Sequence, residues 1–248
     1  MSVTGHPDSP PVKVGVSIAD FLAGYHTTIA ILAALQYQSK TDRGQAIDIS
    51  MQDCVWLVTA IERSPLYFLQ NKIPPKMGAA SSMSVPNNAY PAKDGYVMIA
   101  GNNLRQWEGV LRTIGREDLI GLEKYSSRGQ RANYRDEINA LVEGWTKTKS
   151  TDEILNALRS ARVPCSPVPS FDQVANDPQL LSREMVTEIQ QLTSGKVKVP
   201  GSTFKLSETP GDAKSPAPFL GEHNYDIYHN LLGYSEQEMK KLTDEGVI

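Results

Sequence analysis

The chain has 248 residues, of which 40% are hydrophobic and 21% charged, so it can bury the core of one large or two ordinary domains and is not a disordered polymer. The formal net charge is -3 and the pI about 5.8, which argues against a nucleic-acid or anionic-membrane surface spread over the whole molecule. The first residues show no basic segment followed by an apolar one, so we expect no signal peptide and a cytoplasmic location.

The first helix is predicted from Ser17 to about Gln38, because apolar residues recur there at helical spacing. Ser17 is a natural N-cap, and Asp20 follows at the spacing of a capping box. The same stretch, Ile18–Leu35, contains Asp20 and His26 and is expected to be too polar for a membrane span.

A break at Thr41–Gln45 is followed by 46–50, which alternates like a strand, and by a second helix at Met51–Leu69. That helix is apolar on most faces and is therefore expected to be buried. The three tryptophans lie in helical patterns and are expected in the core. They are Trp56, Trp107 and Trp145.

Residues 71–88 are rich in Pro, Gly, Ala and Ser and are typical of a linker or a mobile loop. A strand entered by an Asp-Gly turn is predicted at 94–100. Helices are predicted at 103–114, 133–147 and 151–161, the last capped by Ser150 or Thr151.

The three prolines of 163–169 exclude a regular helix there. The remainder is predicted as a short helical segment at 171–183, strands at 185–190 and 196–199, a proline-rich stretch at 210–218, and helices at 224–232 and 235–245. Ser235 and Glu238 form a capping box for the last helix.

Neither the cysteines nor the histidines are spaced like metal ligands. Cys54 and Cys165 lie far apart and are expected to be free thiols. His26 is not on the same helical face as Asp20, so a general-base role for it is disfavoured. We expect no metal site.

Three segments, in order, resemble family III CoA-transferases of the CaiB/BaiF type. The first is G-V-S-I-A-D-F-L-A-G at 15–24, followed by T-D-R-G-Q-A-I-D-I-S at 41–50. The second is Y-P-A-K-D-G-Y-V-M-I-A with N-N-L-R-Q-W shortly after it. The third runs from V-P-C-S-P-V through D-P-Q-L-L-S-R and V-P-G-S-T-F-K-L-S-E-T-P to L-G-E-H. The similarity covers essentially the whole chain.

The resemblance implies an α/β fold with part of a Rossmann-like large domain and a smaller α+β domain. Residues 1–75 would be the helical remainder of the large domain, 76–175 the small domain, and 176–248 a linker and a segment that returns to the large domain. It further implies interlocked homodimers, with no nucleic-acid or membrane partner and no permanently bound cofactor.

The implied activity is transfer of CoA from an acyl-CoA donor to a small carboxylic acid, with the CoA thioester as substrate. The family aspartate, which attacks the thioester, corresponds to Asp20. Considered by its spacing alone, Asp20 is more simply a residue that caps its own helix.

The chemistry also needs donors for a developing oxyanion, and small residues let backbone N–H groups approach a ligand. The candidates lie where the family has a glycine-rich loop, although a plain linker explains them equally well. They are Gly78, Ala79, Ala80, Ser81 and Ser82.

Two alternatives remain open. Related racemases that act next to a CoA thioester share the fold and the aspartate, but they resemble N-L-x-A-D where this chain has V-S-I-A-D. Family chains also begin with a long nucleotide-binding segment that has no counterpart here. The second alternative is therefore that this chain is an inactive fragment, or a subunit that needs a separate N-terminal half.

Overall fold

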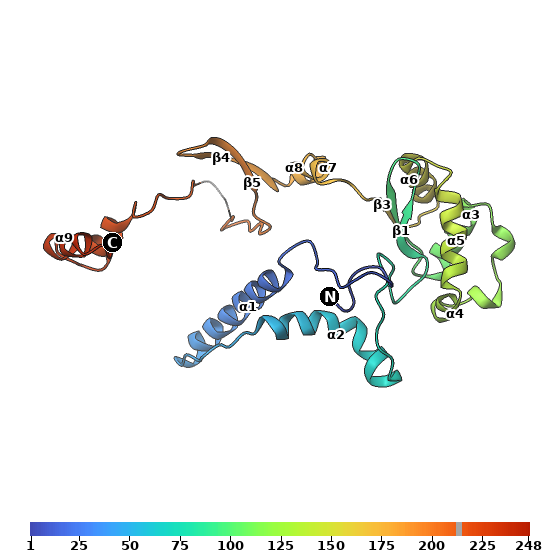
Figure 1. Ribbon diagram of the computed structural model, residues 1–248, viewed down its shortest axis with the longest axis horizontal. Coiled ribbons are helices and arrows are strands. Elements are labelled where there is room, and N and C mark those ends of the chain that lie inside the picture. The colour runs from blue at the N-terminus through green and yellow to red at the C-terminus, as the bar shows by residue number, and fades with distance from the viewer. Residues whose placement is uncertain (212–214) are drawn as a thin grey trace. The chain divides into compact units, whose positions relative to one another are not determined.

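The protein is described from a computed structural model, in which residues 1–211 and 215–248 are defined (Figure 1). The chain divides into two compact units, Met1–Val168 and Pro169–Ile248. This division lies near the predicted boundary at 175, while the predicted boundary at 75 falls inside the first unit. Residues 212–214 of the predicted proline-rich stretch lie outside the described residues.

The first unit begins with two helices, α1 (Ile18–Thr41) and α2 (Met51–Gln70), which pack against each other (Figure 1). Both predicted helices are confirmed. α2 starts at a true N-cap, since Oγ of Ser50 accepts a hydrogen bond from the Asp53 N–H at 3.3 Å. α1 ends at Asp42, whose φ of 56° is left-handed.

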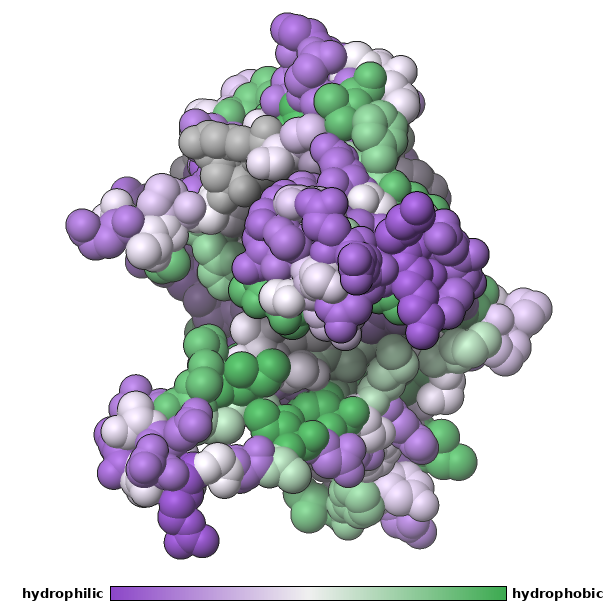
Figure 2. Space-filling model, turned by 90° about the vertical axis from the view of Figure 1, so that its left-hand side faces the viewer, coloured by the Kyte–Doolittle hydropathy of each residue, from purple (hydrophilic) through white to green (hydrophobic). Residues whose placement is uncertain are grey.

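The expectation that α2 is buried is wrong for the described chain. α1 has no buried residue and α2 only Cys54, because the two helices contact chiefly each other. Trp56, expected in the core, is 58% exposed. Apolar side chains gather at the surface in the lower part of Figure 2, at the height of these helices in Figure 1. The large exposed ones on α1 include Phe21, Tyr25, Ile29, Leu32 and Leu35.

The expectation that Ile18–Leu35 is too polar to span a membrane is also wrong by length and composition. Among the described helices, α1 is the one long and apolar enough to cross a bilayer. The same composition is common in long core helices of soluble proteins. α1 packs along α2, which is also what a core helix of a soluble protein would do.

Residues 46–50, predicted as a strand, have no regular structure. A strand needs a neighbour that completes its backbone hydrogen bonds. Within residues 1–211 and 215–248, none pairs with this segment. The alternation of its side chains was therefore insufficient evidence.

The rest of the first unit is a three-stranded antiparallel sheet, in the order β1 (Asn87–Pro91), β2 (Tyr96–Ala100), β3 (Cys165–Pro167). β2 and the turn before it are confirmed, and the Ala92 N–H donates to the Gly95 carbonyl across that turn at 2.8 Å. β1 overlaps the predicted linker, whose end is therefore regular structure. Tyr90 of β1 lies opposite Val97 of β2.

Of the helices beside this sheet, α5 (Arg135–Thr146) contacts β1, and α6 (Thr151–Ser160) contacts β2 and β3 (Figure 1). α3 (Leu104–Thr113) packs against α6, and α4 (Arg128–Asn133) packs against α5. Two short 3-10 turns, η1 (Glu117–Leu119) and η2 (Glu123–Tyr125), connect α3 to α4. Ser150, one of the two predicted caps, begins α6 and forms a capping box with Glu153. The core here includes Tyr90, Val97, Ile99, Trp107, Val110, Leu111, Tyr125, Ile138, Val142, Ile154 and Leu158.

A buried arginine holds the loops of this core together. The Arg131 side chain donates hydrogen bonds to the carbonyls of Val85 at 3.0 Å and Tyr125 at 3.3 Å. It also donates to the carbonyls of Gly101 and Asn102, both at 3.4 Å. Burial lowers the pKa of this guanidinium, and its partners are carbonyl oxygens in place of a carboxylate. Arg131 thus ties three loops to α4.

The second unit contains short helices α7 (Phe171–Ala175) and α8 (Pro178–Ser182), then a hairpin of β4 (Val186–Gln191) and β5 (Gly195–Pro200). It ends with a π-helix, η3 (Tyr225–Leu231), and the α-helix α9 (Glu236–Asp244). The two predicted strands and the capping box of Ser235 with Glu238 are confirmed, and the strands pair as a hairpin.

Candidate active site

Asp20 lies in the first turn of α1, at the third helical position, and is exposed. The predicted capping box with Ser17 is wrong. The Ser17 backbone, at φ -77° and ψ 64°, is not in the extended conformation of a usual N-cap, and its side chain caps no backbone N–H. Over the described residues the Asp20 carboxylate makes no hydrogen bond or ion pair. Both oxygens are therefore available to a ligand.

Asp20 is one of the residues that line a cavity of about 420 Å³. Its walls come from the N-terminal residues, the start of α1 and the facing side of α2. Lys13 supplies a positive charge, and Thr4, Ser17 and Thr59 supply hydroxyl groups. The apolar part is lined by Val3, Val14, Val16, Ile18, Leu22, Val55 and Val58. Asp20 thus stands, exposed, on a mostly apolar wall in the first turn of a helix.

The candidate loop has most of its backbone donors already engaged. The N–H groups of Gly78, Ala80 and Ser81 donate to Gly5, Met77 and Asn87 carbonyls at 2.8, 3.1 and 2.9 Å. The Met83 N–H donates to Oγ of Ser81 at 3.1 Å. In the described structure, the backbone N–H groups of Ala79 and Ser82 are therefore the ones in this loop that have no hydrogen-bond partner. Fewer oxyanion donors remain than the sequence suggested.

Ser82 carries a second possible donor. Its Oγ is buried yet has no hydrogen-bond partner in the part of the chain that the structure describes. The preceding carbonyl, of Ser81, accepts a hydrogen bond from Arg135 at 2.8 Å. Burial is the largest effect on Arg135 and lowers its pKa. The start of α5 therefore fixes the backbone from which the unpaired hydroxyl projects.

The N-terminal residues connect the loop with the aspartate. Met1, Val3 and Thr4 line the Asp20 cavity, and the next residue, Gly5, accepts the hydrogen bond from Gly78. Sequence reasoning missed this contribution, and it also missed Lys13 and Thr59. Lys13 precedes Asp20 closely in the chain and could have been noticed as a nearby charge. Nothing local in the sequence indicates Thr59.

His26 is not part of this site. Its Nδ1 lies 2.8 Å from the Leu22 carbonyl of the preceding turn. The ring lines a different cavity, of about 370 Å³, together with Asp48, Asp53 and Cys54. Across the described residues, no group of three or more His, Cys, Asp or Glu side chains is arranged to hold a metal ion.

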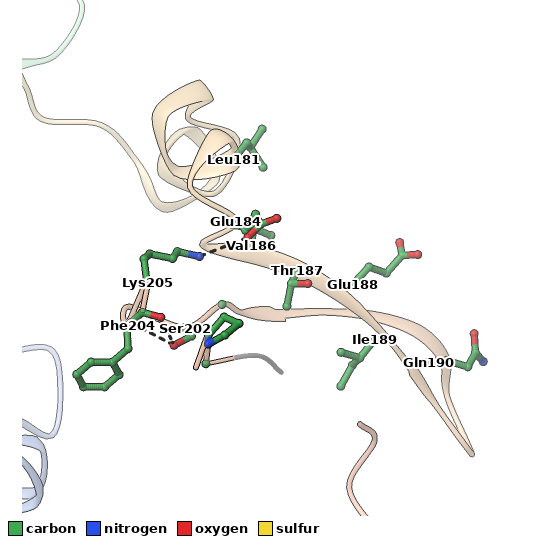
Figure 3. A pocket seen from close by; sticks show the side chains of 13 residues that line it. Leu181, Glu184, Val186, Thr187, Glu188, Ile189, Gln190, Ser202, Phe204 and Lys205 are labelled. Atoms are coloured by element: carbon green, nitrogen blue, oxygen red, sulfur yellow. Dashed lines mark hydrogen bonds and ion pairs between the residues drawn. The ribbon is translucent and has the colours of Figure 1, made fainter. Parts of the chain in front are cut away.

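A cavity of about 560 Å³ lies in the second unit, between the β4–β5 hairpin and the segment after it (Figure 3). Its charged feature is an ion pair of Lys205 with Glu184 at 3.5 Å, with Ser202 and Phe204 nearby. The two charges satisfy each other, and the cavity contains no predicted site residue. Size alone does not make it the reactive site.

Comparison with known proteins identifies the chain. The sequence profile described as CoA-transferase family III matches residues 1–224. The alpha subunit of succinyl-CoA–L-malate CoA-transferase from Chloroflexus aurantiacus is 32% identical, over 99% of this chain and 58% of that protein. Formyl-CoA:oxalate CoA-transferase from Streptomyces avermitilis is 31% identical, over 100% of this chain and 64% of that protein.

The crystal structure of a CAIB/BAIF family protein from Brucella suis is similar, with a TM-score of 0.74 and 32% identity. The alignment covers 93% of this chain and 60% of that one. The chain belongs to CoA-transferase family III and has its mixed α/β fold, as the sequence predicted. The two named enzymes among these relatives are CoA-transferases, and the chain spans about three fifths of the length of these relatives.

Proposed function

We propose that this chain transfers CoA from an acyl-CoA donor to a carboxylic acid through the carboxylate of Asp20. The observation that carries the proposal is the unpartnered carboxylate of Asp20, at a helix N-terminus within a cavity of about 420 Å³. An ionised carboxylate is the nucleophilic form. A residue engaged in capping would have to break its own hydrogen bond before it could attack.

In the proposed reaction, a carboxylate oxygen of Asp20 attacks the thioester carbon, the C–S bond breaks, and CoA leaves as a thiolate. A mixed anhydride remains on Asp20. The thiolate then attacks the Asp20 carbonyl carbon, which releases the donor acid as a carboxylate and leaves an aspartyl-CoA thioester. The acceptor acid repeats these steps in reverse and regenerates Asp20, so no proton or electron is left over.

Each attack places negative charge on a carbonyl oxygen, which needs donors close by. Near Asp20 we propose the Lys13 ammonium and the Thr4 and Thr59 hydroxyls, which line the cavity. From the loop we propose the unpartnered donors of Ala79 and Ser82. Gly78, Ala80 and Ser81 then support the loop through their own hydrogen bonds.

We further propose that the active assembly contains a second chain. The exposed apolar faces of α1 and α2 support this. One of the similar CoA-transferases is itself an alpha subunit. The partner is proposed as a separate N-terminal half, within an interlocked homodimeric assembly in the cytoplasm. The acids used by the named relatives, malate and oxalate, are the first acceptors to test.

The test is the intact mass of the chain after incubation with a panel of acyl-CoA donors. Asp20→Asn removes the nucleophile. Asp53→Asn is the matched control, because Asp53 holds the same third position of α2. We expect a CoA-sized adduct on the wild type and on Asp53→Asn, and none on Asp20→Asn.

An adduct that persists on Asp20→Asn would refute the assignment of Asp20. If the wild type forms none, the experiment is repeated with the N-terminal half of a family member added. Absence of an adduct in that reconstituted sample would refute CoA transfer by this chain. Deuterium uptake into a 2-methylacyl-CoA without any acceptor acid would favour the racemase alternative instead.

A further inference from the structure

One contact in the first unit joins segments that are far apart in sequence. The Gly78 N–H donates to the Gly5 carbonyl at 2.8 Å. The imidazole of His6 lies against the same glycine, since a β-carbon placed on Gly78 would be 2.9 Å from Nδ1 of His6 and 3.2 Å from its Cε1. Gly78 also has a φ of 62°, which favours glycine independently.

A second contact lies beside the first. Nζ of Lys76 donates to the Ser9 carbonyl and, at 3.4 Å, to the Pro10 carbonyl. Oγ of Ser9 donates to the His6 carbonyl at 2.8 Å, and the Ser9 N–H donates to the same oxygen at 3.1 Å. Residues 6–9 therefore form a closed turn, whose His6 ring contacts Gly78 and whose Ser9 carbonyl accepts from Lys76.

Crowding at Gly5 fixes this arrangement further. Gly5 has a φ of 105°, and a β-carbon there would lie 2.7 Å from Val12 Cγ2 and 2.8 Å from Oγ of Ser9. The N-terminal segment can therefore fold back on itself, with Ser9 and Val12 close to Gly5, because residue 5 has no side chain. Thr4, immediately before it, already lines the cavity of Asp20.

We propose that residues Gly5–Pro10 form a strap that holds Lys76–Gly78 against the N-terminal wall of the Asp20 cavity, with His6 as its positioning residue. The strap fixes one end of the loop that carries Ala79 and Ser82. Arg135 fixes the other end through the Ser81 carbonyl. Its effect on the reaction rests on the proposed function of Asp20, whereas the strap itself does not.

Amide hydrogen exchange tests the strap without any reaction. The full chain is compared with His6→Ala, which removes the ring, and Lys76→Met, which removes the ammonium. Peptides covering Gly78 are expected to exchange about 3- to 10-fold faster in both variants, the range for loss of one ordinary hydrogen bond. His6→Asn, whose planar amide places a polar atom near the position of Nδ1, is expected to restore most of the protection.

Asp8→Ala is the matched control, because Asp8 lies in the same turn, is exposed, and makes no side-chain hydrogen bond in the described structure. It is expected to exchange like the wild type. Equal exchange at Gly78 in His6→Ala, Lys76→Met and the wild type would overturn the strap. So would equally fast exchange in the Asp8→Ala control.

The link to catalysis is measured as the rate of CoA-adduct formation on Asp20, in whichever sample the wild type reacts. His6→Ala is expected to lower the rate at saturating donor about 10-fold, with little change in the half-saturating concentration, because misplacement affects the reacting geometry more than binding. An unchanged rate would overturn the positioning role. A wild type that forms no adduct would refute the function of Asp20, and the exchange data would still decide the strap.

Discussion

Replacing Arg131 with methionine tests whether the buried guanidinium holds the loops of the first unit together. Methionine fills a similar volume but donates no hydrogen bond. The Val85 and Tyr125 carbonyls would lose donors at 3.0 and 3.3 Å, and those of Gly101 and Asn102 would lose donors at 3.4 Å.

Leaving a buried acceptor without its partner costs about 1–3 kcal/mol. The two shortest hydrogen bonds, to the Val85 and Tyr125 carbonyls, are counted. Part of their loss is offset because the variant no longer buries a charged group. The expected loss in the free energy of unfolding is then about 2–4 kcal/mol. Urea unfolding followed by tryptophan fluorescence measures it, because Trp107 packs edge-on against Tyr125 with ring centroids 5.4 Å apart.

Arg128→Met is the control, since Arg128 is exposed and donates one hydrogen bond, to the Asn102 carbonyl at 3.3 Å. Its expected effect is below about 1 kcal/mol. If Arg131→Met were as stable as the wild type, the four carbonyl contacts would contribute no net stability. The account of Arg131 as the group that ties these loops to α4 would then be wrong.

Three further predictions concern other parts of the chain. Hydrogen bonds from Lys124 and, to a lesser extent, from Tyr125 lower the pKa of Glu137. The stability that these bonds contribute is therefore present above the ordinary carboxyl pKa and is lost as the pH falls through the lowered pKa. Glu137→Gln should make the free energy of unfolding depend less on pH in the acid range, and an unchanged dependence would contradict this. A methyl group at Gly201 would overlap the Glu184 carbonyl, so Gly201→Ala should speed amide exchange throughout the β4–β5 hairpin, and wild-type exchange would show that the backbone yields easily. Burial raises the pKa of the Cys165 thiol, so alkylation followed by mass spectrometry should reach half its maximal rate at a higher pH than a peptide thiol, and an equal or lower pH would refute this.

The sequence predicted those elements whose signals are local. The cap of α6 at Ser150 and the capping box of Ser235 with Glu238 depend on residues within one helical turn, and both are confirmed. Residues 46–50 and β1 were assigned wrongly for a shared reason. A strand is defined by its hydrogen-bonded neighbour, and neither alternation nor composition tells whether a neighbour exists. The apolar content of α2 likewise says nothing about what covers it.

For the candidate site, the limits of sequence are different. Spacing alone identified Asp20 as a cap, and only the resemblance suggested a nucleophile. The absence of the cap depends on the Ser17 backbone, at ψ 64°, which spacing does not determine. The contact of His6 with Gly78 joins two segments on either side of both long helices, so no local pattern could have indicated it.

The uncapped start of α1 also matters to anyone who engineers this chain for stability. A side-chain cap at that position would add about 0.5–2 kcal/mol of helix stability, and standard stabilising designs would install one. In such a design, a carboxylate or hydroxyl that accepts a hydrogen bond from the first N–H groups of the helix raises the stability of the helix. At this helix the gain in thermal tolerance would come from engaging the Asp20 oxygens that the substrate is proposed to meet. Selection for heat resistance and selection for turnover would therefore favour opposite conformations of one turn.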